Sequence, residues 1–451
     1  MKQRITILGA GESGTGAAIL AKAKGYEVFV SDSGLINDKF KDELIAHDVA
    51  FEEGGHSTDK ALDCALMVKS PGIPDQTPVV IAARTASVQV IDEIEFAYRF
   101  IKDNIIAITG TNGKTTTTLL TYHLLKESGL NVALAGNVGI SFARQVAEGQ
   151  HDWYVLEVSS FQLDGVRTFN PNIGVLLNIT PDHMDRYRNS MQAYADSKFR
   201  LIANMGPEQY FICFVDDPAI ASELQRRRII PQQVHVSLKG SADAWYDGTN
   251  MNFTFHEDFS VNPTDTTLVG QHNYINTMAA VSAARLAGVS VEAIRKGLKT
   301  FRNAPHRLEP VGTIKGVSFI NDSKATNVDA VAYALGSYDG PLIWIAGGID
   351  KGNDYSQIRE EVAAKVKALI CLGKDNEKLK RVFRDVVEIV RETQEVNELV
   401  RMALEMAASG DVVLLSPACA SFDLFKNYMD RGDQYREAVQ KLKEEVEGNA
   451  V

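Results

Sequence analysis

The chain has 451 residues, of which 45% are hydrophobic and 23% charged, and its formal net charge at pH 7 is −11. This length predicts about three domains, and the composition is typical of a soluble globular protein. The excess of acidic residues argues against nucleic acid as a main partner, because no surplus of Lys and Arg is present to neutralise a phosphate backbone.

The N-terminus and the cysteines indicate where the protein acts. The chain enters an apolar strand almost at once and lacks the apolar segment of a signal peptide. No apolar run approaches the roughly 18 residues that span a bilayer, so we expect no membrane insertion and a cytoplasmic location. The cysteines are widely spaced and form no C-x-x-C pair, which favours free, mostly buried thiols at Cys64, Cys213, Cys371 and Cys419.

The N-terminal part of the chain alternates strands and helices. Strands are expected at 5–8, 27–31 and 67–69, with a helix of small residues after the first. The first strand leads into Gly9-Ala10-Gly11-Glu12-Ser13-Gly14, and Asp32 follows the second, as in a dinucleotide-binding fingerprint. The pattern predicts only that a pyrophosphate can approach the backbone, which suits NAD or a nucleotide sugar. The alternative is a tight turn that packs the helix on the strand.

A phosphate-binding loop follows the apolar run 105–108. Residues 109–118 read T-G-T-N-G-K-T-T-T-T, with a helix expected from Lys114. Gly110 and Gly113 let backbone N–H groups wrap phosphate oxygens, Lys114 reaches the terminal phosphates, and Thr115 holds magnesium. The general P-loop pattern would place glycine at position 108, where this chain has isoleucine, so this is a shorter sub-type. The loop therefore predicts ATP binding. The alternative is a Gly/Thr-rich turn with a solvated lysine.

Further strands and helices complete the prediction of an α/β fold. Apolar runs at 132–134, 153–158 and 174–179 each end in a polar cluster, and Glu157 and His183 follow two of them. Short alternating segments between 234 and 270 predict a small antiparallel patch, and an alanine-rich helix is expected at 273–287. Strands at 318–320, 342–345, 368–371 and 411–415 and a last helix at 434–447 define a third α/β unit.

We therefore expect three α/β domains, with boundaries at residues 1–92, 93–304 and 305–451. The N-terminal and C-terminal domains are predicted to be Rossmann-like. The central domain is predicted to be a P-loop ATPase-like parallel sheet that carries the small antiparallel patch.

The T-G-T-N-G-K-T-T segment resembles the Mur ligase family, and the likeness extends over essentially the whole chain. Within that family, segments 304–307, 320–327 and 416–423 are similar to the members that add D-glutamate. The resemblance implies ATP-driven amide formation between UDP-N-acetylmuramoyl-L-alanine and D-glutamate through an acyl phosphate, in peptidoglycan precursor synthesis. Small molecules would be its partners, and we expect a monomer.

The resemblance also implies which residues bind ATP and metal. Its ATP contacts are Gly110, Thr111, Asn112, Gly113, Lys114, Thr115, Thr116, Asn273, Asn276, Arg307 and Asp322. Two magnesium ions are implied, with Thr115, Glu157 and His183 as ligands. Lys198 falls where the family carries a carbamylated lysine, whose anionic carbamate can ligate or support the ions. Lys114, Glu157, His183 and Lys198 are thus the expected catalytic residues.

Two further sets follow from the resemblance. UDP-substrate binding is implied for Gly11, Ser13, Gly14, Asp32, Ser33, Ser70, Pro71, Gly72, Asn137 and Ser159, although Gly34 stands where relatives often carry a basic residue. Binding of D-glutamate is implied for Lys324, Thr326, Lys351, Ser421, Phe422 and Tyr428.

The residues taken alone allow other interpretations. Lys198 could be a solvated helix residue, His183 a core histidine, Asn273 a helix cap and Asn137 a turn-stabilising asparagine. Three alternative functions are considered: a folylpolyglutamate synthase-like ligase, an NAD-linked dehydrogenase with a regulatory ATP site, and a non-catalytic nucleotide-binding module. The complete nucleotide-binding unit at the N-terminus argues against the first, and the ATP loop against the second.

Overall fold

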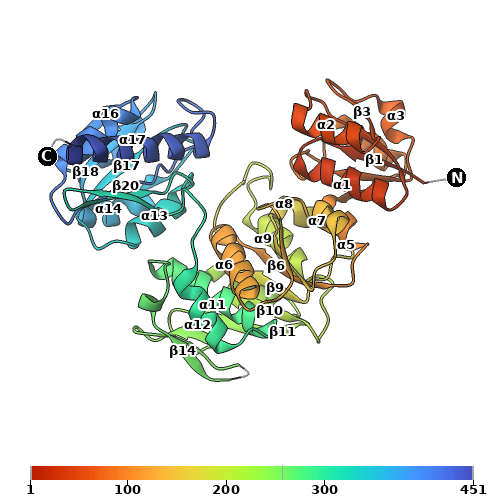
Figure 1. Cartoon of the computed structure of the whole chain (residues 1–451), viewed down its shortest axis with the longest axis horizontal. Coiled ribbons are helices and arrows are strands. Elements are labelled where there is room, and N and C mark those ends of the chain that lie inside the picture. The colour runs from red at the N-terminus through yellow and green to blue at the C-terminus, as the bar shows by residue number, and fades with distance from the viewer. Residues whose placement is uncertain (1–2, 256, 449–451) are drawn as a thin grey trace. The chain divides into compact units, whose positions relative to one another are not determined.

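The computed structural model describes residues 3–255 and 257–448. The chain folds into two compact units, one formed by residues 1–267 and 275–301 and the other by 268–274 and 302–451. Three separate β-sheets organise these units, two in the first and one in the second (Figure 1). Each sheet and its helices are described below by themselves.

The first sheet has five parallel strands in the order β3-β2-β1-β4-β5. Chain order reverses between β1 and β4, which creates a switch point at the carboxyl ends of these strands, where ligands bind in such sheets. The strands are β1 Arg4–Leu8, β2 Glu27–Ser31, β3 Ala50–Glu52, β4 Leu66–Lys69 and β5 Gln89–Asp92. The helices are α1 Glu12–Ala23, α2 Asp38–Ala46, α3 Thr58–Leu62 and α4 Pro78–Thr85.

The second sheet has nine strands in the order β14-β13-β12-β11-β10-β9-β6-β8-β7. Strands β6 to β12 pair in parallel, whereas β13 and β14 add an antiparallel hairpin. The strands are β6 Asn104–Thr109, β7 Val132–Gly136, β8 Trp153–Glu157, β9 Ile173–Leu176, β10 Tyr210–Phe214, β11 Gln232–Ser237, β12 Ala244–Tyr246, β13 Met251–Phe253 and β14 Phe259–Val261.

Helices surround this sheet. They are α5 Glu93–Tyr98, α6 Lys114–Glu127, α7 Phe142–Glu148, α8 Ser160–Asp164, α9 Met191–Phe199, α10 Pro218–Arg226, α11 Gln271–Leu286 and α12 Val291–Thr300, with 3-10 turns at Arg200–Ile202 and Pro263–Asp265. Strand β6, with the sequence NIIAIT, is buried from Ile105 to Thr109. Its continuous apolar run is typical of a parallel strand that is covered on both faces.

The third sheet has six strands in the order β15-β16-β20-β17-β18-β19, and only β15 runs antiparallel to its neighbour. Apolar clusters fill both of its faces. The strands are β15 Glu309–Ile314, β16 Val317–Asn321, β17 Leu342–Ala346, β18 Val366–Leu372, β19 Ile389–Thr393 and β20 Val412–Leu415. The helices are α13 Val328–Gly336, α14 Arg359–Lys365, α15 Glu377–Phe383, α16 Val396–Met406 and α17 Tyr428–Gly448, with a 3-10 turn at Tyr355–Ile358.

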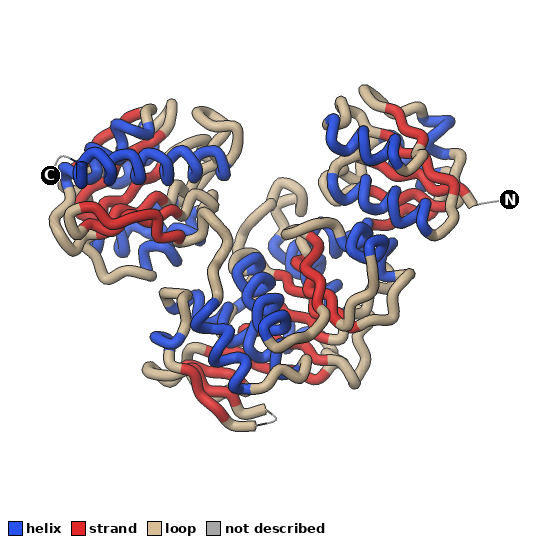
Figure 2. The backbone as a smooth tube through the Cα atoms, viewed as in Figure 1, coloured by secondary structure: helices blue, strands red, loops and turns tan. Residues whose placement is uncertain are grey.

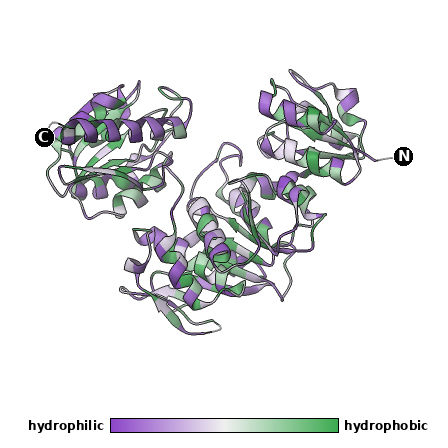
Figure 3. Cartoon of the chain, viewed as in Figure 1, coloured by the Kyte–Doolittle hydropathy of each residue, from purple (hydrophilic) through white to green (hydrophobic). Residues whose placement is uncertain are grey.

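The tube view shows helices packed beside the strands of each sheet, with the antiparallel patch of the second sheet at its edge (Figure 2). Hydrophobic residues concentrate on the strands, and long stretches of the covering helices, α17 above all, are hydrophilic (Figure 3). In the described part of the chain, no helix combines the length and the apolar character needed to cross a bilayer. The cysteines are free thiols, with Cys213, Cys371 and Cys419 buried and Cys64 partly exposed.

The α/β class and the antiparallel patch are confirmed, but two helix starts were predicted wrongly. Helix α11 begins at Gln271, so Asn273 lies inside its first turn and is not the cap. Helix α17 begins at Tyr428, not near 434. Strands β15 and β19 were not expected from the sequence. Pro310 and Gly312 interrupt β15, and β19 is largely polar, with the sequence IVRET.

Candidate active site

The loop after β6 forms a phosphate-binding turn that ends at the N-terminus of α6. Gly113 precedes the helix in a left-handed conformation, with φ of 83°. A Cβ atom at Gly113 would lie 2.3 Å from Oδ1 of Asn276, so the loop and α11 approach too closely for any other residue. The Thr117 hydroxyl also donates to Asn276 Oδ1 at 3.2 Å. The structure therefore brings Asn276 against the loop, as the predicted nucleotide site requires.

Two lysines converge on one carbonyl of this loop. Lys114 Nζ donates to the carbonyl oxygens of Gly110 at 2.8 Å and Thr111 at 2.7 Å. Lys198 Nζ, from α9, donates to the same Gly110 oxygen at 2.7 Å. Two ammonium groups held this close would repel each other, which disfavours the charged form of one of them. The Lys114 ammonium and the N–H groups at the start of α6 are then the positive charges that a polyphosphate would meet.

Lys198 is buried, so its interpretation as a solvated helix residue is wrong. Its side chain is 1% exposed and lies over the Tyr194 ring, 4.5 Å from the centroid. Burial, followed by the nearby Lys114 ammonium, holds the pKa of Lys198 well below its usual range. A lysine in this state has an increased fraction of neutral amine, which is the form that can react with carbon dioxide.

Three residues that shape the loop were missed by the sequence analysis. Asn178 pairs with the loop backbone, accepting from Asn112 N–H at 2.8 Å and donating to Asn112 C=O at 3.1 Å. The Thr111 hydroxyl donates to Thr180 C=O at 3.1 Å and lies 3.3 Å from the Tyr194 hydroxyl. Asn178 and Thr180 follow β9 and could have been sought there, because the carboxyl ends of parallel strands meet at one edge.

Glu157 is the last residue of β8, beside this loop, and one of its carboxylate oxygens has no hydrogen-bond partner among the described residues. Its side chain is 2% exposed, and Asn137 Nδ2 donates to Oε1 at 2.7 Å. Oε2 is buried without a hydrogen-bond partner. A buried carboxylate oxygen left in this state is unfavourable unless a cation or another donor reaches it. Asn137, expected at the substrate or in a turn, here orients Glu157.

His183 follows β9 in a strained loop. Its backbone has φ of 53°, and its side chain is 51% exposed, so the interpretation as a core histidine is wrong. The Phe161 ring lies against it with centroids 4.8 Å apart, and the Arg186 guanidinium covers the same ring at 3.8 Å. Partial desolvation of this half-exposed ring lowers the pKa of His183 although Asp182 opposes the shift; Lys114 and Lys198 add to the lowering, and the neutral form that ligates metals is favoured.

These residues fit a magnesium site that ATP would complete. Within residues 3–255 and 257–448, no three His, Cys, Asp or Glu side chains gather around one point. Magnesium in nucleotide enzymes usually takes one or two protein ligands and fills the rest with phosphate oxygens and water. The orphaned Glu157 Oε2 and the buried Thr115 at the start of α6 match that pattern.

Most of the residues predicted to bind the UDP-substrate gather at the switch point of the first sheet, whereas Asn137 and Ser159 follow β7 and β8 of the second sheet. Asp32 accepts from Ala10 N–H at 2.7 Å and Gly34 N–H at 2.8 Å, which ties the glycine loop to the end of β2. A Cβ atom at Gly9 would lie 2.7 Å from Ser70 Oγ, so the loop after β4 is adjacent as well. The loops that carry Gly11, Ser13, Gly14, Ser33, Pro71 and Gly72 are therefore brought together.

Two residues of the predicted UDP-substrate set, Ser159 and Pro71, make contacts within the protein. Ser159 caps α8 in a capping box with Gln162, which uses its hydroxyl. The Pro71 carbonyl accepts from Arg186 Nη1 at 3.2 Å, so the turn after β4 contacts the loop that carries His183.

The remaining predicted residues, apart from Asn276, lie in the second compact unit. Asp322 is 8% exposed, accepts from Ser416 Oγ at 3.0 Å and from Leu308 N–H at 3.2 Å, and has its pKa raised to about 7 by burial. Arg307 neighbours it and is half-buried. Asn273 Nδ2 donates to Val269 C=O at 2.7 Å.

The predicted D-glutamate residues share the carboxyl edge of the third sheet. Lys324 Nζ lies 4.0 Å from the centroid of the Tyr428 ring, at the start of α17. Lys351 and Phe422 are exposed, whereas Ser421 is buried and Thr326 is half-buried. Asp350, to which no role was assigned, accepts from Gly352 N–H at 2.7 Å and so shapes the Lys351 loop.

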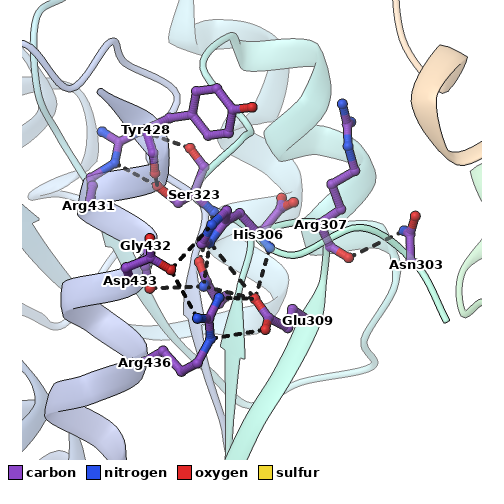
Figure 4. Close-up of polar contacts among 12 residues, drawn as sticks. Asn303, His306, Arg307, Glu309, Ser323, Tyr428, Arg431, Gly432, Asp433 and Arg436 are labelled. Carbon is purple, nitrogen blue, oxygen red and sulfur yellow. Dashed lines mark hydrogen bonds and ion pairs between the residues drawn. The ribbon is translucent and has the colours of Figure 1, made fainter. Parts of the chain in front are cut away.

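A buried arginine, missed by the sequence analysis, joins the loops of this edge. Arg431, on α17, is 1% exposed, and its guanidinium points toward Ser323 (Figure 4). It donates to Ser323 C=O at 2.9 Å, to Cys419 C=O at 3.2 Å and to Gly347 C=O at 3.4 Å. It thus connects the loops after β16, β17 and β20.

A phosphate-binding loop on a parallel sheet, together with two further α/β sheets, defines a multidomain nucleotide-binding enzyme. Residues 4–79 match the MurD N-terminal domain, 108–284 the Mur ligase middle domain and 306–419 the glutamate ligase domain of Mur ligases. The chain belongs to the Mur ligase family.

Curated relatives and solved structures agree with this assignment. UDP-N-acetylmuramoylalanine–D-glutamate ligase of Cytophaga hutchinsonii is 51% identical over 448 residues, which cover 98% of this chain and 100% of the relative. The enzyme of the same name from Salinibacter ruber is 41% identical over 98% of both chains. A UDP-N-acetylmuramate–alanine ligase structure from Thermotoga maritima has a TM-score of 0.63 at 17% identity, over 98% of this chain and 100% of that one. This last likeness concerns the fold alone.

Proposed function

We propose that this chain is the ATP-dependent ligase that joins D-glutamate to UDP-N-acetylmuramoyl-L-alanine in the synthesis of the peptidoglycan precursor. The observation that carries the proposal is the phosphate-binding loop with Lys114 on its carbonyls, next to which β8 ends in the buried Glu157 carboxylate with one oxygen unpartnered. Such a site suits two anions that must approach each other, the ATP triphosphate and a substrate carboxylate. Curated relatives that align over 98% of the chain carry the name of this activity.

The chemistry requires charge neutralisation and alignment. Backbone N–H groups at the start of α6 and the Lys114 ammonium bind the phosphates, while Glu157 and His183 stand where the substrate carboxylate would meet the γ-phosphate. Bound magnesium, held by Thr115, Glu157 and His183, would screen the two anions from each other; we propose two ions. The carboxylate oxygen attacks the γ-phosphorus, ADP leaves, and the D-glutamate amine then displaces phosphate from the acyl phosphate.

Lys198 serves this site as a carbamate in our proposal. The ammonium first releases one proton to water; the neutral amine nitrogen then bonds to the carbon of carbon dioxide and releases a second proton, so a cation becomes an anion. The change removes the repulsion from Lys114 and provides oxygen ligands for metal ions. Support comes from the burial of Lys198, which disfavours the ammonium form.

The other predicted residues would bind the UDP moiety, the adenosine and D-glutamate. The loops after β1, β2 and β4 bind the UDP moiety, with the pyrophosphate at the N-terminus of α1. Asn273, Asn276, Arg307 and Asp322 contact adenosine and its phosphates. Lys324, Thr326, Lys351, Ser421, Phe422 and Tyr428 bind D-glutamate. We propose domain boundaries at residues 1–92, 93–304 and 305–451, a monomeric state and a cytoplasmic location.

Phosphate release tests this function. The purified protein is given ATP, magnesium and UDP-N-acetylmuramoyl-L-alanine, and the added amino acid is varied. We expect phosphate and amide product with D-glutamate, and neither with L-glutamate or L-alanine. Release that is indifferent to the amino acid would contradict the proposal. Activity with a folate and L-glutamate, or a change in nicotinamide absorbance, would favour the folylpolyglutamate synthase-like or dehydrogenase alternative.

A further inference from the structure

The first residue of helix α1 is a glutamate, at the end of the helix where an anion is expected to bind. Glu12 lies in the glycine loop between Gly11 and Ser13, both of which are predicted to bind the UDP-substrate. Gly11 precedes the helix and has no side chain to cap it. The N-terminus of a helix attracts anions, and a carboxylate in the first turn competes with any other anion there. Glu12 would therefore weaken pyrophosphate binding unless its charge is compensated.

Arg144, on helix α7, binds the Glu12 carboxylate with two of its nitrogen atoms. Its Nε donates to Oε1 at 2.8 Å and its Nη2 donates to Oε2 at 3.3 Å. The backbone N–H of Ser141 also donates to Oε1, at 3.1 Å. Three donors from the segment 141–144 thus hold the carboxylate against α7, and both of its oxygens accept hydrogen bonds.

The two helices are packed closely enough to keep this ion pair in place. A Cβ atom at Gly16 would lie 1.9 Å from Ser141 Oγ and 3.2 Å from Arg144 Cβ, so α1 and α7 meet at Gly16. Both helices belong to the first compact unit, and residues of both lie in one apolar cluster. The Arg144 side chain is 12% exposed and that of Glu12 is 32% exposed. Solvent and salt therefore screen this pair less than they screen a fully exposed one.

A second carboxylate shares the same guanidinium. Arg144 Nη1 lies 2.7 Å from Oε2 of Glu43, on α2. Burial opposes the charge of Arg144, but the bonds to Glu12 and Glu43 outweigh it and raise the pKa of Arg144. Burial also opposes the ionised form of Glu12, but the bonds from Arg144 and Ser141, with a smaller contribution from Lys39, lower its pKa. Without the guanidinium, the weaker influence of Lys39 would have to offset the Glu12 charge at the start of α1.

We propose that Arg144 is a positioning residue for the nucleotide-sugar substrate: it holds the Glu12 carboxylate against α7 and neutralises it, so that the pyrophosphate can bind at the N-terminus of α1. The inference rests on the proposed function, in which this terminus binds the UDP moiety. Arg144 also joins α1 and α2 to α7, and this structural role does not depend on the charge of Glu12. The two roles therefore predict different results for a variant that lacks both charges.

Binding of UDP-N-acetylmuramoyl-L-alanine in the absence of ATP, measured by calorimetric titration, tests the proposal. We expect Arg144→Met, which removes the charge but keeps a long side chain, to raise the Kd about tenfold, the effect of one uncompensated charge within about 10 Å. The loss should shrink as salt is added, because salt screens the repulsion. Combining Glu12→Gln with Arg144→Met should restore most of the affinity, since this carboxylate then no longer repels the phosphates.

Glu43→Gln combined with Arg144→Met is the matched control. It removes the other carboxylate that shares the guanidinium, which belongs to α2 and lies outside the glycine loop. We expect this protein to bind the substrate as weakly as Arg144→Met does. Should Arg144→Met fail to fold, Arg144→Gln removes the charge but keeps an amide that can donate to Glu12. It should show the same rise in Kd and the same recovery with Glu12→Gln.

Three results would overturn the inference. The first is a folded Arg144→Met protein that binds the substrate as tightly as the wild type. The second is a double variant with Glu12→Gln that still binds as weakly as Arg144→Met, because the arginine would then act through helix packing alone. The third is an equal recovery with Glu43→Gln, since the position of the carboxylate would then not matter. A wild-type protein that does not bind the nucleotide sugar would instead contradict the proposed function.

Discussion

Lys198 occupies a position where an ammonium ion is poorly stabilised. Within residues 3–255 and 257–448 its hydrogen-bond acceptor is the Gly110 carbonyl at 2.7 Å; the Tyr194 ring lies under it, Lys114 repels it, and Asp182 and Asp164 act on it only through their charge. A buried lysine without a carboxylate partner is rare in proteins unless it serves a function. The Lys198 environment therefore favours a modified or metal-supporting role over a purely structural one.

Removal of the Lys198 side chain should abolish activity, and small carboxylic acids should partly rescue it. We expect Lys198→Ala to lose nearly all ligase activity and to regain part of it when acetate or formate is added, because the carboxylate replaces the carbamate. Initial rates against acid concentration measure the effect. Lys296→Ala, on the exposed face of α12, should keep full activity and show no response. Absence of rescue in a folded Lys198→Ala protein would count against the carbamate.

Arg431 shows how one buried side chain can set several loops. Its guanidinium donates to carbonyls of three loops, a geometry that a lysine ammonium cannot reproduce. We expect Arg431→Lys to raise the KM for D-glutamate about tenfold and to reduce stability by about 1.5–3 kcal/mol, as for hydrogen bonds to charged groups. Steady-state kinetics and thermal melting measure both. Arg401→Lys, in an exposed pair with Glu445, should change neither; a normal KM in Arg431→Lys would refute this role.

At the scale of elements, helix α6 joins the phosphate-binding loop to the sheet. It begins after Gly113 and ends before Gly129, and both glycines have left-handed backbones, with φ of 83° and 90°. The two differ in their surroundings, because a Cβ atom at Gly113 meets Asn276 at 2.3 Å and one at Gly129 meets nothing within 4 Å. Gly129 therefore serves as a control for Gly113, because both have a left-handed backbone but only Gly113 lies close to another residue.

Alanine at these two positions separates strain from steric exclusion. Both Gly113→Ala and Gly129→Ala should lose about 1–2 kcal/mol of stability, the strain of a left-handed alanine. Only Gly113→Ala should also lose ATP binding, because the new methyl group pushes Asn276 and the loop apart. Calorimetric titration with ATP measures this. Equal ATP affinity in the two variants would show that the close approach is not needed for binding.

At this scale the sequence predicts local structure only. The apolar run followed by T-G-T-N-G-K-T-T predicts a buried strand, a loop and a helix, and the structure has β6 and α6 at these positions. Asn178 and Tyr194 could not be predicted, because they reach the loop across 66 and 83 residues of chain. Asn321 likewise donates to Gly432 C=O in α17, 111 residues further along. Such contacts are set by sheet order, which no local pattern encodes.

At the scale of the whole molecule, the three sheets do not have three independent cores. One continuous apolar cluster contains Ile7 and Val30 of the first sheet together with Ile105 and Leu156 of the second. The third sheet has separate clusters on its two faces, which include Trp344 and Ile370. A shared core couples the unfolding of the parts that share it, whereas separate cores allow separate opening.

Two matched core truncations should therefore act on different parts of the chain. Ile105 and Ile370 lie in parallel strands and are 1% and 0% exposed. Replacing either by alanine should remove about 2–5 kcal/mol of stability. By hydrogen exchange, Ile105→Ala should loosen the strands of both the first and second sheets and leave β16 to β20 protected. Ile370→Ala should do the reverse. If either variant raised exchange equally in all three sheets, the chain would open as one cooperative body and its two units would not be energetically separate.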